Sequence, residues 1–506
     1  MTTYYITTPI YYVNDIPHIG HAYTTLAADV LSRFKRLDGF DVKFLTGTDE
    51  HGQKVEKAAE KQGISPQEFT DKISKPFRDL CGTLNFQNDD FIRTTEERHK
   101  KAATYFWNKL QENGHIYEGK YSGWYSVRDE AFYAESELTE AGLAPTGAPV
   151  EWVEEASFFF DLSKWQDKLL EFYETNPDFI RPSSRRNEVI SFVKGGLLDL
   201  SISRTTSKWG IPVPGHPEHV MYVWLDALTN YISALGYPEN TSDFSKFWPA
   251  NVHIVGKDIL RFHAVYWPAF LMAAGITPPK TIFAHGWWTN EGEKISKSLG
   301  NVIDPVGLVQ EFGVDYVRYY LMREVILGND GNFSRSGFVA RINSELANKI
   351  GNLAQRTLAF INKNCDAKVP EILNPKELIL SSSLIKLAYG YLDKFRGNID
   401  NQDINSVMDG IVKLAEEANI YIDAQAPWAL KKTDVSKMNE VLFILLETIR
   451  IIGIYLIPFI PESANKILDQ LDISSDERSF KNISAEYILK AGSTLPTPEP
   501  IFKRLE

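Results

Sequence analysis

The first fifty residues follow the order strand, helix, strand, and this order constrains the fold more than any other feature of the sequence. Residues 2–8 are rich in Tyr, Ile and Thr and predict a strand, with a turn over residues 9–17. Apolar residues at every fourth position then predict a helix: Ala22, Leu26, Val30 and Phe34. Gly39 is typical of a helix end, and residues 42–45 predict the second strand. This order with short links favours a doubly wound α/β sheet.

The same alternation returns after an interruption. Residues 116–221 are rich in aromatic residues, Gly and Pro, and predict an inserted, partly β domain. Residues 252–255 and 281–284 are short apolar strands, and each ends beside a polar cluster, where open α/β sheets carry their ligands. From residue 341 onward the spacing of apolar residues predicts helices. The chain therefore combines an α/β part with an all-α part.

Composition excludes several classes of protein. The 54 Lys and Arg residues against 66 Asp and Glu residues give a net charge of −12, so a nucleic-acid site must be a local patch. A hydrophobic fraction of 43% with 24% charged residues is typical of globular proteins and excludes a mostly disordered chain. The apolar stretch 441–460 contains Glu447 and Arg450, so it predicts a buried core helix rather than a membrane span.

Cysteine is scarce in this chain. Only Cys81 and Cys365 occur, which favours a reducing compartment and excludes a zinc site built from four thiolates. The first residues lack the basic and apolar regions of a secretory signal. We therefore expect a cytoplasmic protein that does not bind membranes.

Two histidines stand where the first helix is expected to begin, in the segment His18-Ile19-Gly20-His21. A helix N-terminus attracts anions through its dipole and its backbone N–H groups, and imidazole N–H groups add donors. Gly20 lets a ligand approach the backbone closely. The motif indicates a phosphate site, although a lone histidine pair is more often a capping or core feature.

A second polar motif, Lys294-Ile295-Ser296-Lys297-Ser298, lies in a loop flanked by glycines. Two lysines three residues apart, with hydroxyl groups beside them, can clamp a polyphosphate. Taken alone, such a segment is more often a solvated surface loop.

Together, and in this order on an α/β pattern, the two motifs resemble the two signatures of class I aminoacyl-tRNA synthetases. Further segments resemble the methionyl-tRNA synthetase family: residues 9–14 (PIYYVN), 47–52 (GTDEHG), 222–227 (YVWLDA), 256–259 (GKDI) with 262–263 (FH), and 285–288 (HGWW). The resemblance runs over nearly the whole chain, to residues 500–504.

The resemblance implies a two-step reaction. The carboxylate of L-methionine attacks the α-phosphate of ATP, giving methionyl-adenylate and diphosphate, and the methionyl group then moves to the 3′-terminal adenosine of tRNA(Met), releasing AMP. Because such catalysis rests on positioning and charge stabilisation, the expected catalytic residues are His18, His21, Lys294 and Lys297. The expected ATP-binding residues are these four with Gly20, Ser296 and Ser298. Mg²⁺ would accompany ATP with few protein ligands.

The resemblance also implies a methionine pocket in which Asp49 takes the ammonium group. The expected lining of the side-chain slot is largely apolar: Ile10, Tyr12, Trp224, Ala227, Leu228, Tyr231, Ile259, His263 and Trp267. Aromatic rings suit a polarizable sulfur, and a Tyr or His could supply one directional contact. Each aromatic residue could instead be part of the core. The family usually has Pro where Leu228 stands, so the slot is expected to differ in shape there.

A polar face in the helical part matches the family's anticodon-reading pattern. Asn348, Asn352 and Arg356 are spaced to share one helix face, and Pro427-Trp428 follows further along. In the window 341–368, five Lys and Arg against two Asp and Glu give +3. Asn can read base edges, and an exposed Trp can stack on an unpaired base, so the expected target is the CAU anticodon. Without the resemblance, an amphipathic helix and a buried Trp428 would be preferred.

The chain departs from many members of the family in two respects. Residues 123–133 contain no cysteine where other members carry a zinc knuckle, so the chain resembles the zinc-free branch and no structural zinc is expected. A C-terminal dimerisation domain is not found after the helical part, so a monomer is expected. The insertion is also too short for a hydrolytic editing domain, and selectivity would come from the synthetic pocket.

These observations give an expected division of the chain. Its parts are a Rossmann-like catalytic domain in two halves, 1–115 and 222–287, an inserted connective domain without a zinc knuckle, 116–221, a stem-contact region with the lysine–serine loop, 288–340, and an α-helical anticodon-binding domain with a C-terminal tail, 341–506.

Other functions fit less well. A cysteine enzyme of the same class would use a zinc–thiolate site, and a leucine enzyme would have a longer insertion. A relative that makes an adenylate without charging tRNA would not need the helical part. A silent tRNA-binding protein would not need both phosphate motifs. The sequence contains neither a phosphate-binding G-x-x-x-x-G-K-[ST] motif nor a G-x-G-x-x-G after the first strand, which argues against P-loop enzymes and dehydrogenases.

Overall fold

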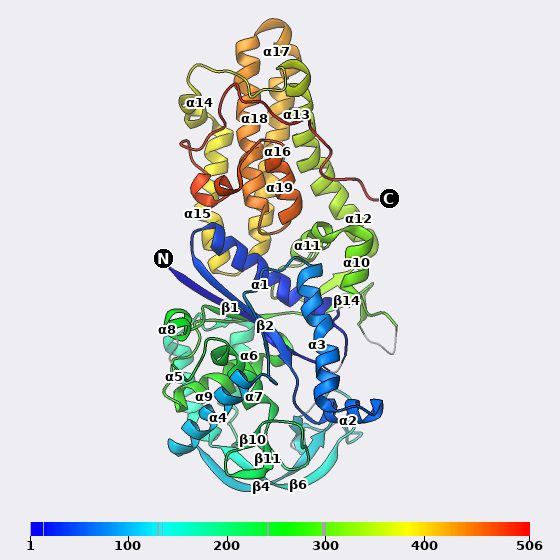
Figure 1. Ribbon diagram of the computed structural model, residues 1–506, viewed down its shortest axis with the longest axis vertical. Helices are drawn as coiled ribbons and strands as arrows, with labels where there is room; N and C mark the ends of the chain where they lie inside the picture. Colours follow the sequence, from blue (N-terminus) through cyan, green and yellow to red (C-terminus); the bar gives the residue numbers. More distant parts are fainter. Residues whose placement is uncertain (1, 14, 129–130, 134, 240–241, 296–299) are drawn as a thin grey trace.

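The computed structural model describes residues 2–13, 15–128, 131–133, 135–239, 242–295 and 300–506. Its centre is a six-stranded parallel sheet in which the strand order reverses between β1 and β12 (Figure 1). In spatial order the strands are β3 (Asp90–Arg93), β2 (Asp41–Asp49), β1 (Thr3–Tyr12), β12 (Val252–Gly256), β13 (Ile282–His285) and β7 (Ile180–Arg181). This is the doubly wound α/β sheet expected from the sequence, and its ligand site belongs at the reversal.

Both faces of the sheet are buried, as a parallel sheet requires. On β1, Tyr4 and Ile6 point to a core shared with α1 (Ile19–Leu37) and the helical part of the chain. Tyr5 points to the opposite core, where α4 (Glu97–Glu112), α7 (Val223–Ser233) and α9 (Trp267–Ala273) pack. Figure 1 shows α1 between the sheet and the helical part, with α4, α7 and α9 on the far side.

Strand β1 is longer than the sequence pattern predicted. The turn expected over residues 9–17 is wrong in its first part, because residues 10–12 pair with residues 47–49 of β2. The register shifts between Thr7 and Ile10, around Pro9. Proline has no N–H to donate to a ladder, so the strand absorbs it as an irregularity and continues. The extension carries Tyr12 to a position opposite Asp49.

The expected insertion is not one separate unit. Its β strands form two small antiparallel sheets, with orders β5-β4-β6-β8 and β10-β11-β9. Their bounds are β4 Ile116–Ser126, β5 Ala131–Tyr133, β6 Glu151–Phe160, β8 Leu200–Ser201, β9 Ser203–Arg204, β10 Pro212–Val213 and β11 His216–Met221. Between β6 and β8, which are neighbours in the first of these sheets, the chain returns to the large sheet as β7, which is preceded by α5 (Gln166–Thr175) and followed by α6 (Ser183–Lys194).

Aromatic packing links the long strands of the insertion. Trp124 on β4 pairs with Trp152 on β6, and their rings meet edge to face with centroids 5.3 Å apart. Within the residues that the structure describes, no cluster of three or more His, Cys, Asp or Glu side chains could hold a metal ion. The absence of zinc stays a prediction.

The segment after the sheet forms a small sheet and two helices. The strands β14 (Trp288–Asn290), β15 (Glu293–Lys294) and β16 (Gly331–Phe333) lie in the order β15-β14-β16. Helices α10 (Pro305–Phe312) and α11 (Val314–Arg323) follow the loop. Asp304 caps α10, and Pro305 stands at its first position, where a missing N–H costs nothing.

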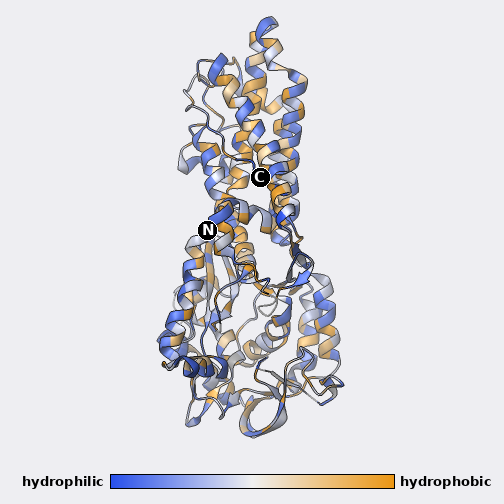
Figure 2. Ribbon diagram, turned by 90° about the vertical axis from the view of Figure 1, so that its right-hand side faces the viewer, coloured by the Kyte–Doolittle hydropathy of each residue, from blue (hydrophilic) through white to orange (hydrophobic). Residues whose placement is uncertain are grey.

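The remainder of the chain is helical, as predicted. Its helices are α12 (Arg335–Arg341), a π-helical segment (Ile342–Gly351), α13 (Asn352–Asn364), α14 (Pro375–Ser381), α15 (Ser383–Asp400), α16 (Ile404–Gln425), α17 (Pro427–Thr433), α18 (Val435–Leu456) and α19 (Pro461–Asp469). Hydrophobic and hydrophilic residues alternate along the long helices (Figure 2). Helix α18 is buried over almost its whole length, and among the described helices none is long and apolar enough to cross a membrane.

Arg318 on α11 ties the α/β part to the helical part. Its guanidinium is wholly buried and pairs with Asp29 on α1 (Nη2–Oδ2, 2.7 Å). It also donates to three backbone carbonyl oxygens, each 2.9 Å away: those of Leu84, Pro458 and Phe459. The bound carboxylate accepts further from Arg33 and from the backbone N–H of Gln87. One side chain therefore joins α1, α11 and the end of α18.

Replacing Arg318 with methionine should lower the free energy of unfolding by about 3–5 kcal/mol, since buried carbonyl oxygens lose their donor and Asp29 loses one of its cations. Urea unfolding followed by tryptophan fluorescence measures this change. Arg335→Met is the matched control, because Arg335 is mostly exposed and pairs with Glu311, and its loss should cost less than about 0.5 kcal/mol. Equal effects of the two substitutions would contradict the role given to Arg318.

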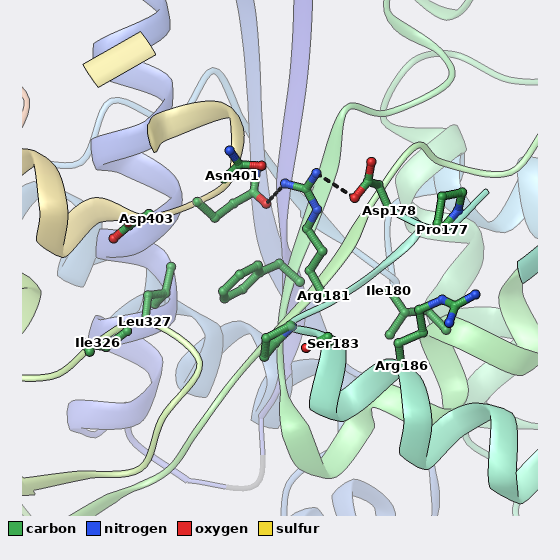
Figure 3. Close-up of a pocket in the computed structure, with 13 residues that line it drawn as sticks. Pro177, Asp178, Ile180, Arg181, Ser183, Arg186, Ile326, Leu327, Asn401 and Asp403 are labelled. Carbon is green, nitrogen blue, oxygen red and sulfur yellow. Dashed lines mark hydrogen bonds and ion pairs between the residues drawn. The ribbon is translucent and has the colours of Figure 1, made fainter. Parts of the chain in front are cut away.

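A cavity of about 350 Å³ opens between the α/β part and the helical part. Arg181 on β7 crosses it: the guanidinium pairs with Asp178 (Nη2–Oδ1, 3.1 Å) and donates to the side-chain oxygen of Gln402 (3.2 Å) (Figure 3). The other walls come from the start of α6, from Ile326 and Leu327, and from residues 401–403. Among the described residues, none of those expected to bind ATP or methionine lines this cavity, whose walls come from the α/β part and the helical part.

Candidate active site

Three of the polar residues expected at the site, His18, His21 and Asp49, lie at the carboxyl edge of the sheet, around the reversal of strand order. Helix α1 begins at Ile19 after β1, β2 ends at Asp49, β12 ends at Gly256 and β13 ends at His285. Residues far apart in sequence are thereby brought to one edge. This is the position that open α/β sheets use for ligands.

The two histidines of the first motif cap α1. His18 is the N-cap, and its Nδ1 accepts from the backbone N–H of Gly20 (3.0 Å), while the Nδ1 of His21 accepts from the N–H of His18 (3.1 Å). The ring centroids are 3.9 Å apart. A Cβ on Gly20 would lie 2.9 Å from the His18 ring, so glycine is required for this packing. The motif is therefore both a helix cap and a compact pair of imidazoles.

The protonation of this pair follows from its hydrogen bonds. Burial lowers the pKa of His18 and of His21, and the pKa of His21 is lowered further by the neighbouring His18. Since each Nδ1 accepts a backbone N–H, each neutral ring carries its proton on Nε2. The start of α1 therefore offers two Nε2–H donors in addition to the positive end of the helix dipole.

Asp49 lies at the end of β2 and is buried. In the ladder it stands opposite Tyr12, and its carbonyl oxygen accepts from the N–H of Val13 (3.2 Å). The ring of Tyr12 lies below the ammonium group of Lys54 at 5.3 Å. A buried carboxylate at this edge is suited to a cationic ligand group, because opposite charges attract more strongly where water is excluded.

The expected side-chain slot forms around α7 and the segment after β12. Trp224 at the start of α7 stacks on Phe262, with centroids 3.6 Å apart and planes 11° from parallel. The hydroxyl of Tyr231 lies 2.7 Å from Nε2 of His263, and Nδ1 of His263 lies 2.9 Å from the carbonyl oxygen of Ile259. Burial lowers the pKa of His263 to about 4. The ring is therefore neutral, donates from Nδ1 to the carbonyl and accepts from the tyrosine hydroxyl at Nε2.

The remaining slot residues differ in how far they are buried. Ala227, Leu228 and Tyr231 on α7 are buried, whereas Ile10, Trp224 and Ile259 lie partly exposed against the same core. Trp267 is wholly buried, and its ring contacts those of Phe106, Tyr231 and Trp248. Trp267 is therefore a core residue in this structure that reaches the slot through Tyr231.

The lysine–serine loop is described at its two ends. Lys294 is exposed on β15 and pairs with Thr289 of β14. Asn301 donates from its side chain to the carbonyl oxygen of Lys294 (3.1 Å), and Asn290 donates to the carbonyl oxygen of Asn301 (2.9 Å). Ser296, Lys297 and Ser298 lie outside the described residues. The two asparagines close the base of the loop, a role that the sequence did not indicate.

The expected anticodon residues lie at the surface of the helical part. Asn348 and Asn352 are exposed, and Arg356 is half-buried. The regular α-helix assumed for them is wrong at its start, because residues 342–351 are π-helical and change the spacing of faces. Ala426, with a positive φ of 43°, separates α16 from α17 and lets Pro427 begin the next helix. This break presents Trp428, which is 45% exposed and so not the buried core residue of the alternative reading.

Much of the positive charge counted in residues 341–368 is offset by acidic side chains that lie outside this range. Arg356 pairs with Asp423 (2.6 Å) and lies over the Trp428 ring, 5.7 Å from its centroid. Lys349 pairs with Glu416 (2.6 Å). The surface is therefore less basic than the +3 of residues 341–368 implied. The contact between Arg356 and Trp428 is a structural observation, and the anticodon-binding role of these residues stays a prediction.

Three buried residues near the slot were not predicted from the sequence. Asp226 on α7 contacts His51, after β2, and His99, on α4. A lone carboxylate in the otherwise apolar start of α7 was the signal that could have indicated them, because buried acids need partners.

Comparison with known proteins identifies the family. The model described as "tRNA synthetases class I (M)" matches residues 4–145 and 137–358, and "Anticodon binding domain of methionyl tRNA ligase" matches residues 380–506. The methionine–tRNA ligase of Rickettsia felis is 66% identical over 505 residues, covering 100% of this chain and 99% of its own length. That of Brucella suis is 54% identical, covering 99% of this chain and 98% of its own.

Solved structures agree with the sequence relatives. Mycobacterium tuberculosis methionyl-tRNA synthetase in complex with methionyl-adenylate is 48% identical, with a TM-score of 0.95 and 100% coverage of both chains. The apo form of the same protein is 45% identical, with a TM-score of 0.89, covering 100% of this chain and 99% of its own. The family and the fold expected from the sequence are confirmed: the chain belongs to the methionyl-tRNA synthetases, within class I of the aminoacyl-tRNA synthetases.

Proposed function

We propose that the edge of the sheet described above is where this ATP-dependent ligase activates methionine, and that the residues there divide the work. A carboxylate oxygen of methionine attacks the α-phosphorus of ATP, the bond from that phosphorus to the bridging oxygen breaks, and diphosphate leaves. In the second step a hydroxyl of the 3′-terminal adenosine of tRNA(Met) attacks the acyl carbon, and AMP leaves with the bonding electron pair.

The observation that carries the assignment is the pair of neutral imidazoles at the start of α1. Their Nε2–H groups, fixed by the backbone bonds to Nδ1, are suited to donate to the phosphate oxygens as negative charge develops. Gly20 admits the nucleotide close to the backbone. Lys294 and Lys297, with Ser296 and Ser298, are proposed to hold the leaving diphosphate. Mg²⁺ is proposed to be held mainly by the phosphates of ATP, since it commonly keeps water and few protein ligands.

The methionine end of the site is proposed to recognise two groups. Asp49 binds the ammonium group, and the slot formed by α7, Ile10, Tyr12, Ile259 and His263, with Trp267 behind Tyr231, holds the thioether. The hydroxyl of Tyr231, 2.7 Å from Nε2 of His263, supplies a polar contact beside the aromatic rings. Because His263 is neutral and held at Nδ1, the slot presents no charge to the sulfur, which supports an uncharged side chain as the occupant.

The other proposals concern the organisation and setting of the chain. Residues 1–115 and 222–287 with the β7 region form the catalytic domain, the β sheets within 116–221 form the insertion, 288–340 form the stem-contact region, and 341–506 bind the anticodon. We expect a monomer in the cytoplasm without structural zinc. The free thiols of Cys81 and Cys365 support a reducing compartment.

We propose that five residues of the helical part read the CAU anticodon: Asn348, Asn352, Arg356, Pro427 and Trp428. The substitution Trp428→Ala tests this assignment. Loss of a stacking platform should lower kcat/KM for tRNA charging about 10- to 100-fold, while ATP–pyrophosphate exchange without tRNA stays at the wild-type rate. The reason is that α17 lies at one end of the molecule, far from the large sheet near its middle (Figure 1).

Tyr105→Ala is the matched control, because Tyr105 on α4 is a similarly exposed aromatic residue, at 47%, in the α/β part. Charging assays at several salt concentrations should show no loss for this variant. Unchanged charging by Trp428→Ala, or equal losses in both variants, would remove Trp428 from the anticodon site.

A further inference from the structure

A wholly buried carboxylate on α7 accepts hydrogen bonds from histidines of two other elements. His51 Nδ1 lies 2.6 Å from Oδ2 of Asp226, and His99 Nε2 lies 2.6 Å from Oδ1. The side chains of Asp226 and His99 are fully buried, and that of His51 nearly so. Burial raises the pKa of Asp226, but the charges and hydrogen bonds of the two histidines outweigh it and hold the pKa at about 2. Both imidazoles therefore donate an N–H to a carboxylate.

One of these bonds fixes the end of β2. His51 follows Asp49 by two residues, and its ring meets that of Trp209 edge to face, with centroids 5.5 Å apart. The indole N–H of Trp209 donates to the carbonyl oxygen of Glu50 (2.5 Å), and the carbonyl of Trp209 accepts from Gly52 N–H (3.0 Å). The segment after Asp49, the proposed ammonium-binding carboxylate, is therefore held by hydrogen bonds between Trp209 and its backbone and by the hydrogen bond of the His51 ring to Asp226.

The other bond fixes α7. His99 lies on α4, and its Nδ1 is 2.9 Å from the hydroxyl oxygen of Ser233 at the end of α7. The same ring thus contacts α7 at Asp226 and at Ser233, seven residues apart, which is two turns of the helix. The intervening residues Ala227, Leu228 and Tyr231 belong to the proposed thioether slot. Their position relative to β2 then depends on the bond between His51 and Asp226.

We propose that Asp226 is a positioning residue that sets the distance between the ammonium-binding carboxylate and the thioether slot, and so selects the amino acid by the length of its side chain. The proposal rests on the roles proposed above for Asp49 and for the slot. A buried hydrogen bond to a carboxylate resists a change of length because separating it leaves the carboxylate without its donor in a medium of low polarity. An amino acid one methylene shorter or longer cannot fill both ends of a site of fixed length.

Asp226→Asn tests the proposal, with ATP–pyrophosphate exchange as the assay. The amide keeps the shape but loses one acceptor and the charge, so the methionine KM should rise about 10- to 100-fold while the ATP KM stays unchanged. S-methylcysteine is one methylene shorter than methionine, and ethionine is one methylene longer. The ratio of kcat/KM for methionine to kcat/KM for either analogue should fall about 10-fold. A residue with a merely structural role would not change this selectivity.

His51 provides a second test that does not alter α7. His51→Ala should produce the same rise in methionine KM and the same narrowing of selectivity. His51→Asn should restore both in part, since the amide places an N–H near the position of Nδ1. The double variant Asp226→Asn with His51→Ala should be no worse than the more impaired single variant, because both remove the same bond. If Asp226→Asn does not fold, the two His51 variants decide.

Asp315→Asn is the matched control for burial of a carboxylate. Asp315 is 6% exposed and accepts from the backbone N–H of Ser463 (2.5 Å) at the joint with α19, away from the slot. This variant should lose stability without changing the ratio of methionine KM to ATP KM. The proposal is overturned if the Asp226 and His51 variants, like Asp315→Asn, leave the ratio of methionine KM to ATP KM unchanged. Lack of methionine-dependent exchange by the wild-type chain would instead overturn the proposed function.

Discussion

Replacing His21 with alanine should lower kcat for methionine-dependent ATP–pyrophosphate exchange about 100- to 1,000-fold, which is the range for loss of one fixed donor to a developing charge. The Nδ1 of His21 is occupied by the N–H of His18, so the ring cannot turn away and its Nε2–H remains available. In the proposed role, this donor acts on the phosphates alone. The methionine KM should therefore stay near the wild-type value while kcat falls.

One further variant separates hydrogen-bond donation from packing at position 21, and a second variant, at another histidine, is the control. His21→Asn should recover part of the rate, since an amide can accept from the N–H of His18 and still donate. His216→Ala, which removes a partly exposed histidine at the start of β11, should leave the rate unchanged. A loss in His21→Ala that appeared wholly in the methionine KM would show that His21 shapes the methionine pocket and does not assist the phosphates.

Asp49→Ala should lower kcat/KM for methionine roughly 1,000-fold, because the ammonium group would enter a buried site without a counter-charge. Most of this loss should appear in the methionine KM, and the ATP KM should change little. Exchange assays over a range of methionine concentrations measure both constants. The isosteric Asp49→Asn should be nearly as impaired, since it retains the shape and loses the charge.

The same strand supplies the control. Asp41 begins β2 at the opposite end from Asp49 and pairs with Lys246 at the surface. Asp41→Ala should leave both KM values unchanged, because a surface ion pair contributes little. If Asp49→Ala instead behaved like Asp41→Ala, the ammonium group must be bound elsewhere, and the placement of the thioether slot relative to β2 would also be wrong.

The parts of the fold that could be predicted are those with a regular period. The four-residue spacing of Ala22, Leu26, Val30 and Phe34 predicted α1, which spans Ile19–Leu37 and buries that face. The edge strands β3 and β7 could not be found, because Asp90–Arg93 and Ile180–Arg181 are short and partly charged. What makes them strands is pairing with neighbours remote in the sequence.

The site could be predicted only as far as local motifs reach. The sequence placed His18 and His21 at the expected start of a helix, which α1 confirms, but the bond between Asp226 and His51 joins residues 175 positions apart. No local pattern reports such a contact. The pairing of Lys349 with Glu416 also joins residues remote in the sequence, which is why the positive charge of residues 341–368 was overestimated. The π-helical spacing of residues 342–351 was not indicated by the local pattern either.

The most direct test of the account is ATP–pyrophosphate exchange by the purified chain with each of the twenty amino acids, without tRNA. The site described here predicts exchange with methionine and background rates with the other nineteen, since Asp49 and the neutral slot of Tyr231 and His263 fit an uncharged thioether. Exchange with a different amino acid, or with none, would contradict the methionine pocket.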